Sequence, residues 1–421
     1  MNLATIEKAF AVGKERYEEL GVDVEAALET MSSLTLSLPC WQGDDVRGFE
    51  KIKEPAFSGG IQATGSYPGR ARTADELRRD LKKALALIPG NHRVNLHASY
   101  GEFGHKAVSR DEIEPAHFHG WLSWAKEESV KLDFNATCFA HPKADTGFTL
   151  SSPDKGIRRF WIEHVKRCRK IAGFLGRELK TVCIHNIWIP DGSKDEPFDR
   201  WTPRGLLRES LDEIFQTEYS PSLMKDSLES KLFGLGSEAY VVGSHEFYSG
   251  YALSRRKMVC LDLGHFHPTE SVADKLSALL QFFGELVLHL SRPVRWDSDH
   301  VVILDDELKR VAAEVVRGRA LEKTHLALDF FDASMNRIGA LAVGARATLK
   351  AFLPALLEPE KRLREAEADG DHFRRLALFE EVKTLPFGAL WDYHCLRQGV
   401  PTDRELPDLV KDYERTVLNK R

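Results

Sequence analysis

Between residues 229 and 329, short apolar runs repeatedly end in side chains of the kinds that bind metal ions. Asp262 closes the run Met-Val-Cys-Leu, and Asp329 follows His-Leu-Ala-Leu. Hydrophobic strands that end in Glu, Asp or His are typical of a (β/α)8 barrel whose carboxyl-terminal rim carries a metal site. A hydrophobic core does not need such groups. The pattern therefore predicts a metal centre built from Glu229, Asp262, His265, His289, Asp297, Asp299 and Asp329.

The chemistry of this set favours a divalent cation bound by oxygen and nitrogen. It contains five carboxylates and two imidazoles but no thiolate. Such a shell suits Mn²⁺, Co²⁺, Mg²⁺ or Zn²⁺ and argues against a purely structural zinc site. Five carboxylates packed together repel one another strongly unless cations neutralise them. Two metal ions balance that charge better than one.

Taken singly, several of these residues have simpler interpretations. His289 lies inside an apolar strand, where a histidine is more often a hydrogen-bonded core residue. Asp299 could belong to a turn or a helix cap. Asp332 competes with Asp329, because it follows three residues later and lies nearer a helix start. Together, however, these positions follow predicted strand ends in chain order, which favours the metal site.

Three further side chains could contact a substrate beside the metal ions. Lys231 lies two residues after Glu229, so both point to the same side of an expected strand. A lysine there either holds a substrate oxygen or balances the carboxylates. His97 and Trp188 end two earlier strands. A tryptophan face can stack on a sugar, although a core role fits Trp188 equally, and histidine binds hydroxyl groups or moves protons.

Alternating strand and helix signals would place these residues in a parallel barrel. Strands are expected at 93–97, 132–135, 181–188, about 227–233, 258–263, 286–291, 301–304 and 325–330, with an extra strand possible at 241–244. The intervening segments are long enough for the crossovers that parallel strands require.

The predicted fold is an α/β chain in three parts. An N-terminal helical segment and a glycine-rich loop occupy 1–70, a (β/α)8 TIM barrel occupies 71–344, and a helical extension occupies 345–421. The glycine-rich stretch at 58–69 is either a lid over the barrel or a simple connector.

The composition excludes several classes of protein. The chain has 421 residues and a net charge of −5, without the basic footprint of a nucleic-acid-binding protein. No apolar stretch approaches the roughly 20 residues that span a bilayer. Six cysteines are scattered without a CxxC pair, which predicts buried free thiols and a cytoplasmic protein. The expected partner is a small molecule, with no nucleic acid and no membrane.

Seven segments of this sequence, in order, resemble the L-rhamnose isomerase family. They include Glu-Ser-Lys-Leu-Phe-Gly at 229–234 and Leu-Asp-Leu-Gly-His-Phe-His-Pro-Thr-Glu at 261–270. The other segments lie at 40–46, 59–65, 186–192, 291–301 and 328–334. The Glu-x-Lys, acid-x-x-His and Asp-x-Asp spacings are also similar to those of xylose isomerase. The resemblance runs through nearly the whole chain.

The resemblance implies a xylose-isomerase-like barrel, a homotetramer to which the C-terminal extension contributes, and two divalent metal ions per subunit. Mn²⁺ is the expected ion, with Zn²⁺ or Co²⁺ as alternatives. The first ion would bind Glu229, Asp262, His289 and Asp329. The second would bind His265, Asp297 and Asp299, with Asp262 or a water molecule nearby.

The implied activity is an aldose–ketose isomerisation of L-rhamnose to L-rhamnulose, the first step of L-rhamnose catabolism. A hydride shift between C1 and C2 of the open-chain sugar is expected, and an enediol path with a carboxylate base is the rival. Lys231 would stabilise charge on O1, water beside Asp329 would relay the O2 proton, and His97 would bind the sugar or assist ring opening. The substrate contacts would be Trp188, His97 and Lys231.

Two other classes of function fit parts of the pattern. A metal-dependent phosphodiesterase on the same barrel, such as an abasic-site endonuclease, would use a similar ligand set, but the negative net charge counts against DNA binding. A catalytically silent sugar-binding protein would not need the intact ligand set or Lys231.

Overall fold

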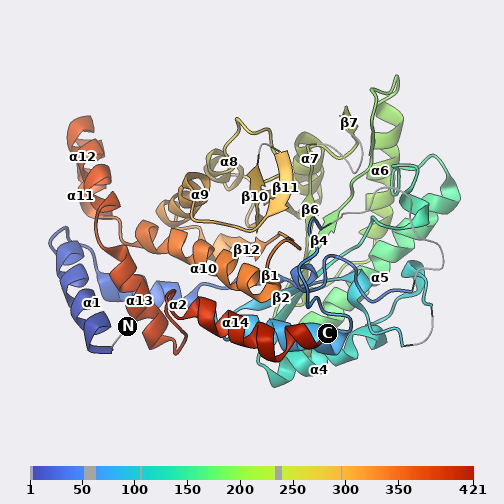
Figure 1. Cartoon of the computed structure of the whole chain (residues 1–421). Helices are drawn as coiled ribbons and strands as arrows, with labels where there is room; N and C mark the ends of the chain where they lie inside the picture. The colour runs from blue at the N-terminus through green and yellow to red at the C-terminus, as the bar shows by residue number, and fades with distance from the viewer. Residues whose placement is uncertain (1–2, 52–62, 105–106, 233–238, 295) are drawn as a thin grey trace.

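Eight parallel strands close into a barrel near the centre of the molecule (Figure 1). The computed structural model describes residues 3–51, 63–104, 107–232, 239–294 and 296–421, with the backbone alone for 296–298. Around the barrel the strands follow the order β1-β12-β9-β8-β6-β4-β3-β2. Their bounds are β1 Leu36–Pro39, β2 Arg93–His97, β3 Lys131–Asn135, β4 Cys183–Trp188, β6 Met224–Glu229, β8 Met258–Asp262, β9 Leu286–Leu290 and β12 Thr324–Leu328.

A helix follows each barrel strand and returns the chain to the start of the next one, which confirms the (β/α)8 TIM barrel. Capping side chains begin several of these helices. Asp154 accepts a hydrogen bond from the Ile157 amide, and Asp305 accepts one from the Leu308 amide. The helices are α3 Ala74–Leu85, α4 His119–Glu127, α5 Lys155–Leu179, α6 Trp201–Ile214, α7 His245–Arg255, α8 Ala273–Leu279, α9 Asp306–Arg317 and α10 Arg337–Leu356.

Two strand predictions were wrong. The barrel's first strand is β1, which lies within the segment 1–70 assigned to the N-terminal extension, so the barrel begins before residue 71. The apolar run 301–304 is not a strand. Val301 and Val302 are buried there, while Ile303 is exposed. A short apolar run can pack on a core without joining a sheet, so hydrophobicity alone did not identify the strand.

Smaller elements refine the predicted boundaries. β6 ends at Glu229, so Lys231 lies in the loop after the strand. The extra strand expected near 241 is confirmed as β7 (Tyr240–Val241), which pairs with β5 (Gly192–Ser193). β10 (Arg292–Val294) and β11 (Trp296–His300) form an antiparallel pair just before the run 301–304. Residues 58–62 of the glycine-rich stretch 58–69 lie outside the described residues, and its role as a lid stays a prediction.

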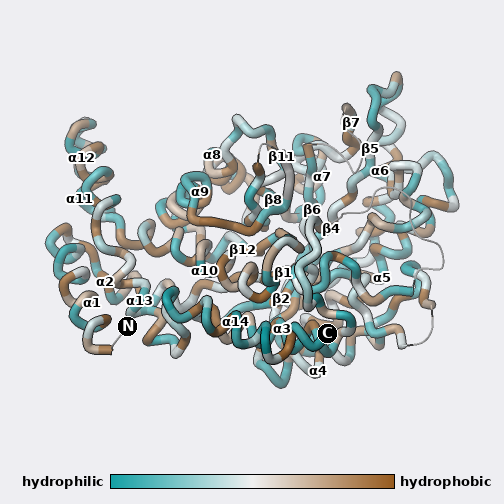
Figure 2. Tube along the Cα trace, in the orientation of Figure 1, coloured by the Kyte–Doolittle hydropathy of each residue, from teal (hydrophilic) through white to brown (hydrophobic). Residues whose placement is uncertain are grey.

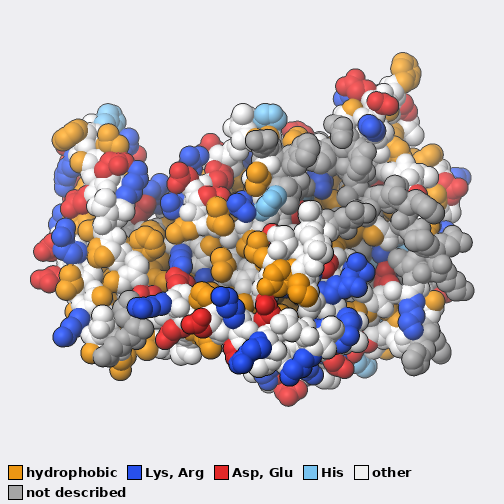
Figure 3. All heavy atoms as spheres, viewed as in Figure 1, with side chains coloured by type: hydrophobic (Ala, Val, Ile, Leu, Met, Phe, Trp, Pro, Cys, Tyr) orange, Lys and Arg blue, Asp and Glu red, His pale blue; other side chains and the backbone are white. Residues whose placement is uncertain are grey.

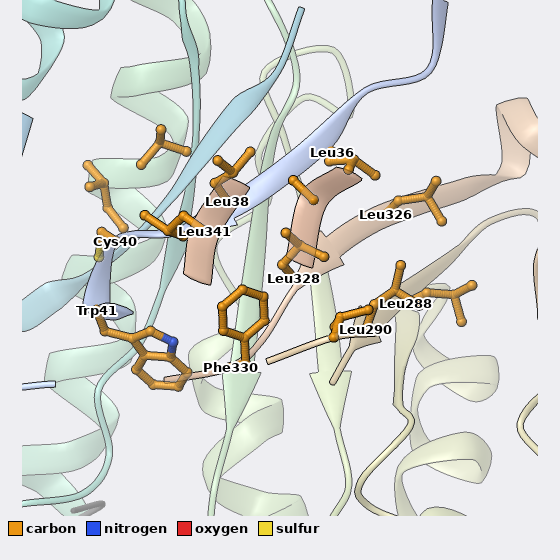
Figure 4. Close-up of a cluster of buried hydrophobic side chains, with 14 of the residues drawn as sticks. Leu36, Leu38, Cys40, Trp41, Leu288, Leu290, Leu326, Leu328, Phe330 and Leu341 are labelled. Carbon is orange, nitrogen blue, oxygen red and sulfur yellow. The ribbon is translucent and has the colours of Figure 1, made fainter. Parts of the chain in front are cut away.

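Apolar side chains of β1, β9 and β12 pack against α10 on one side of the barrel (Figure 4). Leu36, Leu326 and Leu288 are buried in this layer. By length and composition α10 could cross a membrane, but 78% of its apolar window is buried inside the molecule. Figure 2 shows α10 as a largely hydrophobic helix among the surrounding elements. Its apolar composition is therefore explained by its position in the core.

Helices from the two ends of the chain lie together at one side of the barrel (Figure 1). The rings of Phe10 on α1 and Tyr393 on α13 stack 3.7 Å apart. Tyr413 on α14 donates a hydrogen bond of 2.7 Å to Asp80 on α3. The terminal helices are α1 Leu3–Glu18, α2 Val24–Ser33, α11 Glu360–Ala368, α12 His372–Lys383, α13 Phe387–Arg397 and α14 Leu406–Thr416. Helices thus lie in both terminal parts of the chain, and the division into three parts stays a prediction.

Two buried histidines make the fold sensitive to acid. His92 accepts a hydrogen bond from the Leu36 amide, and its other ring nitrogen contacts a carbonyl. His164 has the same arrangement with the Thr137 amide. Each ring therefore must be neutral. Burial lowers the pKa of His92 to about 4 and that of His164 to about 3, whereas an unfolded histidine titrates near 6.5.

We expect the free energy of unfolding to fall as pH drops below 6.5. Below pH 6.5 the unfolded chain binds protons at these two histidines that the folded chain does not bind. The stability that the neutral histidines contribute is therefore complete above pH 6.5 and is lost as pH falls toward 4. At pH 5 each histidine costs about 2 kcal/mol. Denaturant titrations at pH 7.5 and pH 5 measure the difference. His164→Gln should reduce the difference in unfolding free energy between these two pH values by about 2 kcal/mol. His267→Gln, at an exposed position, should not reduce that difference. An unchanged pH dependence in His164→Gln would contradict this account.

Candidate metal centre

The register of the barrel brings four predicted ligands to one rim. Glu229 and Asp262 are the last residues of β6 and β8, and Asp329 directly follows β12. Asp262 lies opposite His289 on the neighbouring strand β9. Because all barrel strands are parallel, these carboxyl ends face the same opening. Residues up to 100 positions apart in the sequence thus supply one cluster.

Glu229, Asp262, His289 and Asp329 can each offer one ligand atom such that all four atoms lie within 4.8 Å of one another. His289 Nδ1 lies 3.0 Å from Asp329 Oδ2, 3.3 Å from Glu229 Oε1 and 3.8 Å from Asp262 Oδ2. His289 Nδ1 thus lies among three carboxylates, a setting that suits a metal ligand. Asp332 is turned elsewhere, since its carboxylate accepts hydrogen bonds from Ser334.

Glu229 and Asp262 each have one carboxylate oxygen that accepts hydrogen bonds from neighbouring groups. Asn186 Nδ2 donates to Glu229 Oε2 at 2.5 Å. Ser291 Oγ donates to Asp262 Oδ1 at 2.8 Å, and the Gly264 amide donates to the same oxygen at 2.6 Å. Donors of this kind fix the orientation of metal ligands. The opposite oxygens, Glu229 Oε1 and Asp262 Oδ2, consequently face the middle of the cluster.

These inward atoms fit a cation. Glu229 Oε1, Asp262 Oδ2 and His289 Nδ1 are buried and complete no hydrogen bond among the residues that the structure describes. Buried polar atoms without partners are costly. A divalent ion coordinated by two carboxylate oxygens and an imidazole nitrogen would satisfy them together. The donor set of the cluster thus matches the chemistry of a metal site.

The electrostatics of the cluster support the same conclusion. Burial raises the pKa of Asp262 to about 7, and burial also raises the pKa of Asp329. Burial opposes ionisation of Glu229 as well, but the positive charge of His289 holds its pKa below the usual value. Protein groups alone therefore cannot keep every carboxylate ionised near neutral pH. A bound cation would do so, and its binding would release protons.

The predicted second set of ligands is placed only in part. His265 Nδ1 lies 3.1 Å from Glu229 Oε1, and Asp299 lines the same pocket as the first cluster. The side chain of Asp297 lies outside the described residues. The structure therefore brings His265 and Asp299 to the predicted site, while the role of Asp297 stays a prediction.

The three predicted substrate contacts line one pocket above the cluster. Lys231 Nζ lies 4.7 Å from the centre of a Trp188 ring, and Trp188 stacks on His265. His97 stacks on Trp41 with ring centres 4.2 Å apart. Burial lowers the pKa of His97 to about 3, so its imidazole is neutral. The pocket holds about 400 Å³, including space open to solvent, and is lined by Trp41, His97, Asn135, Ala136, Asn186, Trp188, Glu229, Lys231, His265, His289, Asp299 and Asp329.

The family model for L-rhamnose isomerase (RhaA) matches residues 4–421. The chain belongs to the L-rhamnose isomerase family. A relative from Rhodopirellula baltica, named L-rhamnose isomerase, is 56% identical over 100% of this chain and 98% of its own length. Relatives of the same name from Bacteroides thetaiotaomicron and Salmonella gallinarum are 56% and 52% identical, each over 99% of both chains.

Membership of the L-rhamnose isomerase family makes this chain an isomerase that acts on a sugar. The phosphodiesterase and the silent sugar-binding protein are therefore excluded as main functions. Lysine, arginine and acidic side chains are interspersed on the face of the molecule drawn in Figure 3. Nothing on that face resembles a continuous basic stripe for nucleic acid. All six cysteines are buried and free, as the sequence predicted.

Three residues of the centre were not among the site residues predicted from the sequence. Trp41 forms part of the pocket wall, but it follows β1, the strand that was not recognised. Asn186 and Ser291 orient ligands on other strands. Both belong to segments that carry the family resemblance. Their positions at strand ends were the available signal, but the contacts that define their roles appear only in three dimensions.

Loss of the Ser291 hydroxyl should weaken metal binding. Ser291→Ala removes a hydrogen bond to Asp262 Oδ1, and we expect a loss of about 10-fold to 100-fold in Mn²⁺ affinity, typical for such outer contacts. Competition with a fluorescent chelator measures the affinity. Ser210→Ala is the matched control, because Ser210 is also buried but bonds to Leu150 far from the cluster. Equal affinities in both variants would contradict the orienting role of Ser291.

Proposed function

We propose that this chain converts L-rhamnose to L-rhamnulose by a hydride shift between C2 and C1 of the open-chain sugar, as the first step of L-rhamnose catabolism. The observation that carries the proposal is the metal-binding cluster with Lys231 and His97 around one pocket. Relatives named L-rhamnose isomerase that align over their whole length support the choice of sugar.

Two divalent ions would occupy the pocket, with Mn²⁺ favoured and Zn²⁺ or Co²⁺ as alternatives. Bound there, such ions would supply Lewis-acid chemistry to the sugar oxygens and would help to hold the reacting carbons in place. One ion would be held by Glu229, Asp262, His289 and Asp329, and the other by His265, Asp297 and Asp299.

The surrounding residues supply charge and proton positions. The hydrogen on C2 leaves with its electron pair and forms the new bond at C1, while O2 loses a proton and O1 gains one. Lys231 carries a positive charge next to the Trp188 face and would stabilise the negative charge that develops on O1. Asp329 would accept the O2 proton through a water molecule. The neutral imidazole of His97 would bind a sugar hydroxyl or assist ring opening.

Deuterium tracing tests the hydride shift against the enediol path. With L-rhamnose labelled by deuterium at C2, a direct shift retains the label at C1 of the ketose. An enediol intermediate passes the hydrogen through a carboxylate base and exchanges it with water. We expect the label to remain in the product in ordinary water. Complete loss of deuterium to solvent during turnover would contradict the hydride shift and favour the enediol.

We further propose that the protein is a cytoplasmic homotetramer and that the helices at 345–421 contribute to its interfaces. Phe373 and Leu376 on α12 are 81% and 59% exposed in a single chain, a pattern that suits burial by another subunit. Buried free thiols suit a reducing compartment. Light scattering should give about four times the chain mass of 47.6 kDa, and a monomer would contradict the proposal.

A further inference from the structure

A second cavity enters the barrel from the end opposite the active-site pocket. It holds about 1380 Å³, including space open to solvent. Its mouth is formed by residues at or before the starts of the strands, among them Thr35, Lys131 and Thr181. Its inner end is lined by Asn186 and His289, and these two residues also line the active-site pocket. The two cavities are therefore bordered by the same two side chains at the level of the metal cluster.

The cavity exists because the barrel interior is divided into two unlike arcs. Barrels of this type usually fill their interior with layers of branched apolar side chains. Here Ile184, Met258, Cys260 and Val287 form such a plug on β4, β8 and β9, within the arc β9-β8-β6-β4, and Ile184 and Val287 also border the cavity. On the other arc, β12, β1, β2 and β3 present the small or polar side chains of Ala327, Ser37, Asn95 and Asp133 to the cavity. Small side chains leave space, and polar ones make the space favourable for water.

Arg93 and Asp133, two charged residues of the cavity wall, are paired with each other. Arg93 contacts both oxygens of Asp133 at 2.7 Å, and Ser37 Oγ donates to Asp133 Oδ2 at 2.7 Å. The Ile184 amide donates to the other oxygen at 2.8 Å. Arg93 and Asp133 attract water into the cavity. Because their charges neutralise each other, they do not create a strong site for another ion. Water is therefore the ligand that fits this cavity best.

Polar atoms continue from the cavity to the active site. Asn186 is only 3% exposed, and its Oδ1 has no hydrogen-bond partner among the described residues. Asn135 Nδ2 donates to Asn95 Oδ1 at 2.6 Å and lies 3.3 Å from His97 Nε2. A buried amide oxygen at the junction of the two cavities is a natural partner for bound water. Water molecules could thus reach the active-site pocket from the N-terminal face of the barrel, through the second cavity.

We propose that the polar arc of the barrel is a water conduit that joins the N-terminal face of the barrel to the metal centre. Through it, water and protons exchange with bulk solvent while a sugar fills the upper pocket. The proposal rests on the proposed function only in that a sugar-like ligand occupies that pocket. The conduit itself does not depend on which reaction follows.

Thiol labelling tests access from the lower face. Ala327 lines the cavity, is 6% exposed and pairs in register with His289, so it lies close to the junction. We expect Ala327→Cys to react with a small charged methanethiosulfonate at least about tenfold faster than native Cys260, which lies in the apolar plug. The rate should persist when an unreactive alditol of the substrate saturates the upper pocket. No labelling of the folded variant, or labelling that the alditol abolishes, would overturn the proposal.

A plugging variant tests whether the conduit supplies the metal centre. Ala327→Leu fills the cavity, whereas Ala327→Ser keeps it open and polar; Ala327→Val is the smaller plug if Leu prevents folding. With Mn²⁺ and the alditol bound, proton relaxation reports exchange of water near the metal. We expect exchange to fall about tenfold in the plugged protein, with unchanged Mn²⁺ affinity and normal exchange in Ala327→Ser. Normal water exchange in the plugged protein would overturn the proposal. The labelling test stays valid even if the protein catalyses a sugar reaction other than the proposed isomerisation.

Discussion

Asp329→Asn should lower kcat/KM for L-rhamnose by about a thousandfold, which corresponds to about 4 kcal/mol of lost transition-state stabilisation. Asp329 Oδ2 lies 3.0 Å from His289 Nδ1 within the cluster of four ligand atoms. An amide keeps the shape of the side chain but removes its charge, so it neither balances a cation nor accepts the O2 proton. Steady-state kinetics with saturating Mn²⁺ measure the effect.

Asp332→Asn is the matched control for this prediction. It makes the same chemical change three residues further along, where the carboxylate accepts bonds from Ser334, and the amide oxygen can still accept them. We expect activity within about twofold of the parent chain, as for substitutions that leave the local contacts in place. If Asp332→Asn were the damaging change and Asp329→Asn harmless, the ligand set derived from the barrel geometry would be wrong.

Lys231→Met should lower kcat by about 100-fold or more with little change in KM, because the charge acts on an oxyanion that forms only in the transition state. Lys231 lines the pocket, with Nζ 4.7 Å from the centre of a Trp188 ring. Lys225→Met is the control, since Lys225 lies near the start of β6, the strand that precedes the Lys231 loop, and pairs with Glu285 at the other end of the barrel. Its kcat should be close to that of the parent chain.

The same variant separates the two roles that the sequence left open for Lys231. If the lysine only balances the carboxylates, its removal lessens repulsion of a cation, so Mn²⁺ should bind more tightly while kcat changes little. If it stabilises the reacting oxygen, kcat falls although the metal remains bound. Tighter Mn²⁺ binding with normal turnover in Lys231→Met would therefore contradict the catalytic assignment.

Much of the site could be predicted because its candidate metal ligands lie at or just after the carboxyl ends of apolar strands. Asp262 and His289 fall in apolar runs long enough to be recognised as strands, and parallel pairing then requires their carboxyl ends to meet. The spacing of helices between those runs indicated the barrel. The cluster of Glu229, Asp262, His289 and Asp329 follows from these two facts, and the structure confirms that their ligand atoms converge.

The errors arose where non-local contacts decide the structure. β1 has only four residues, ends in Pro39, and pairs with β12 almost 300 positions away; the alternation of leucine with threonine and serine at 34–38 was the local signal for it and was overlooked. Trp41 was missed for the same reason, because it follows that strand. The run 301–304 is apolar because it packs on the core, not because it pairs in the sheet. The roles of Asn186 and Ser291 depend on single hydrogen bonds across strands.

The most direct test of the central claim is ketose formation from L-rhamnose by chelator-stripped protein, before and after addition of Mn²⁺. Glu229 Oε1, Asp262 Oδ2 and His289 Nδ1 lack hydrogen-bond partners among the described residues, and the proposed reaction needs a cation there. We predict almost no L-rhamnulose from the stripped protein and restored turnover with Mn²⁺. Full activity without metal, or no turnover of any aldose with metal bound, would contradict the assignment of this cluster as the metal centre of an isomerase.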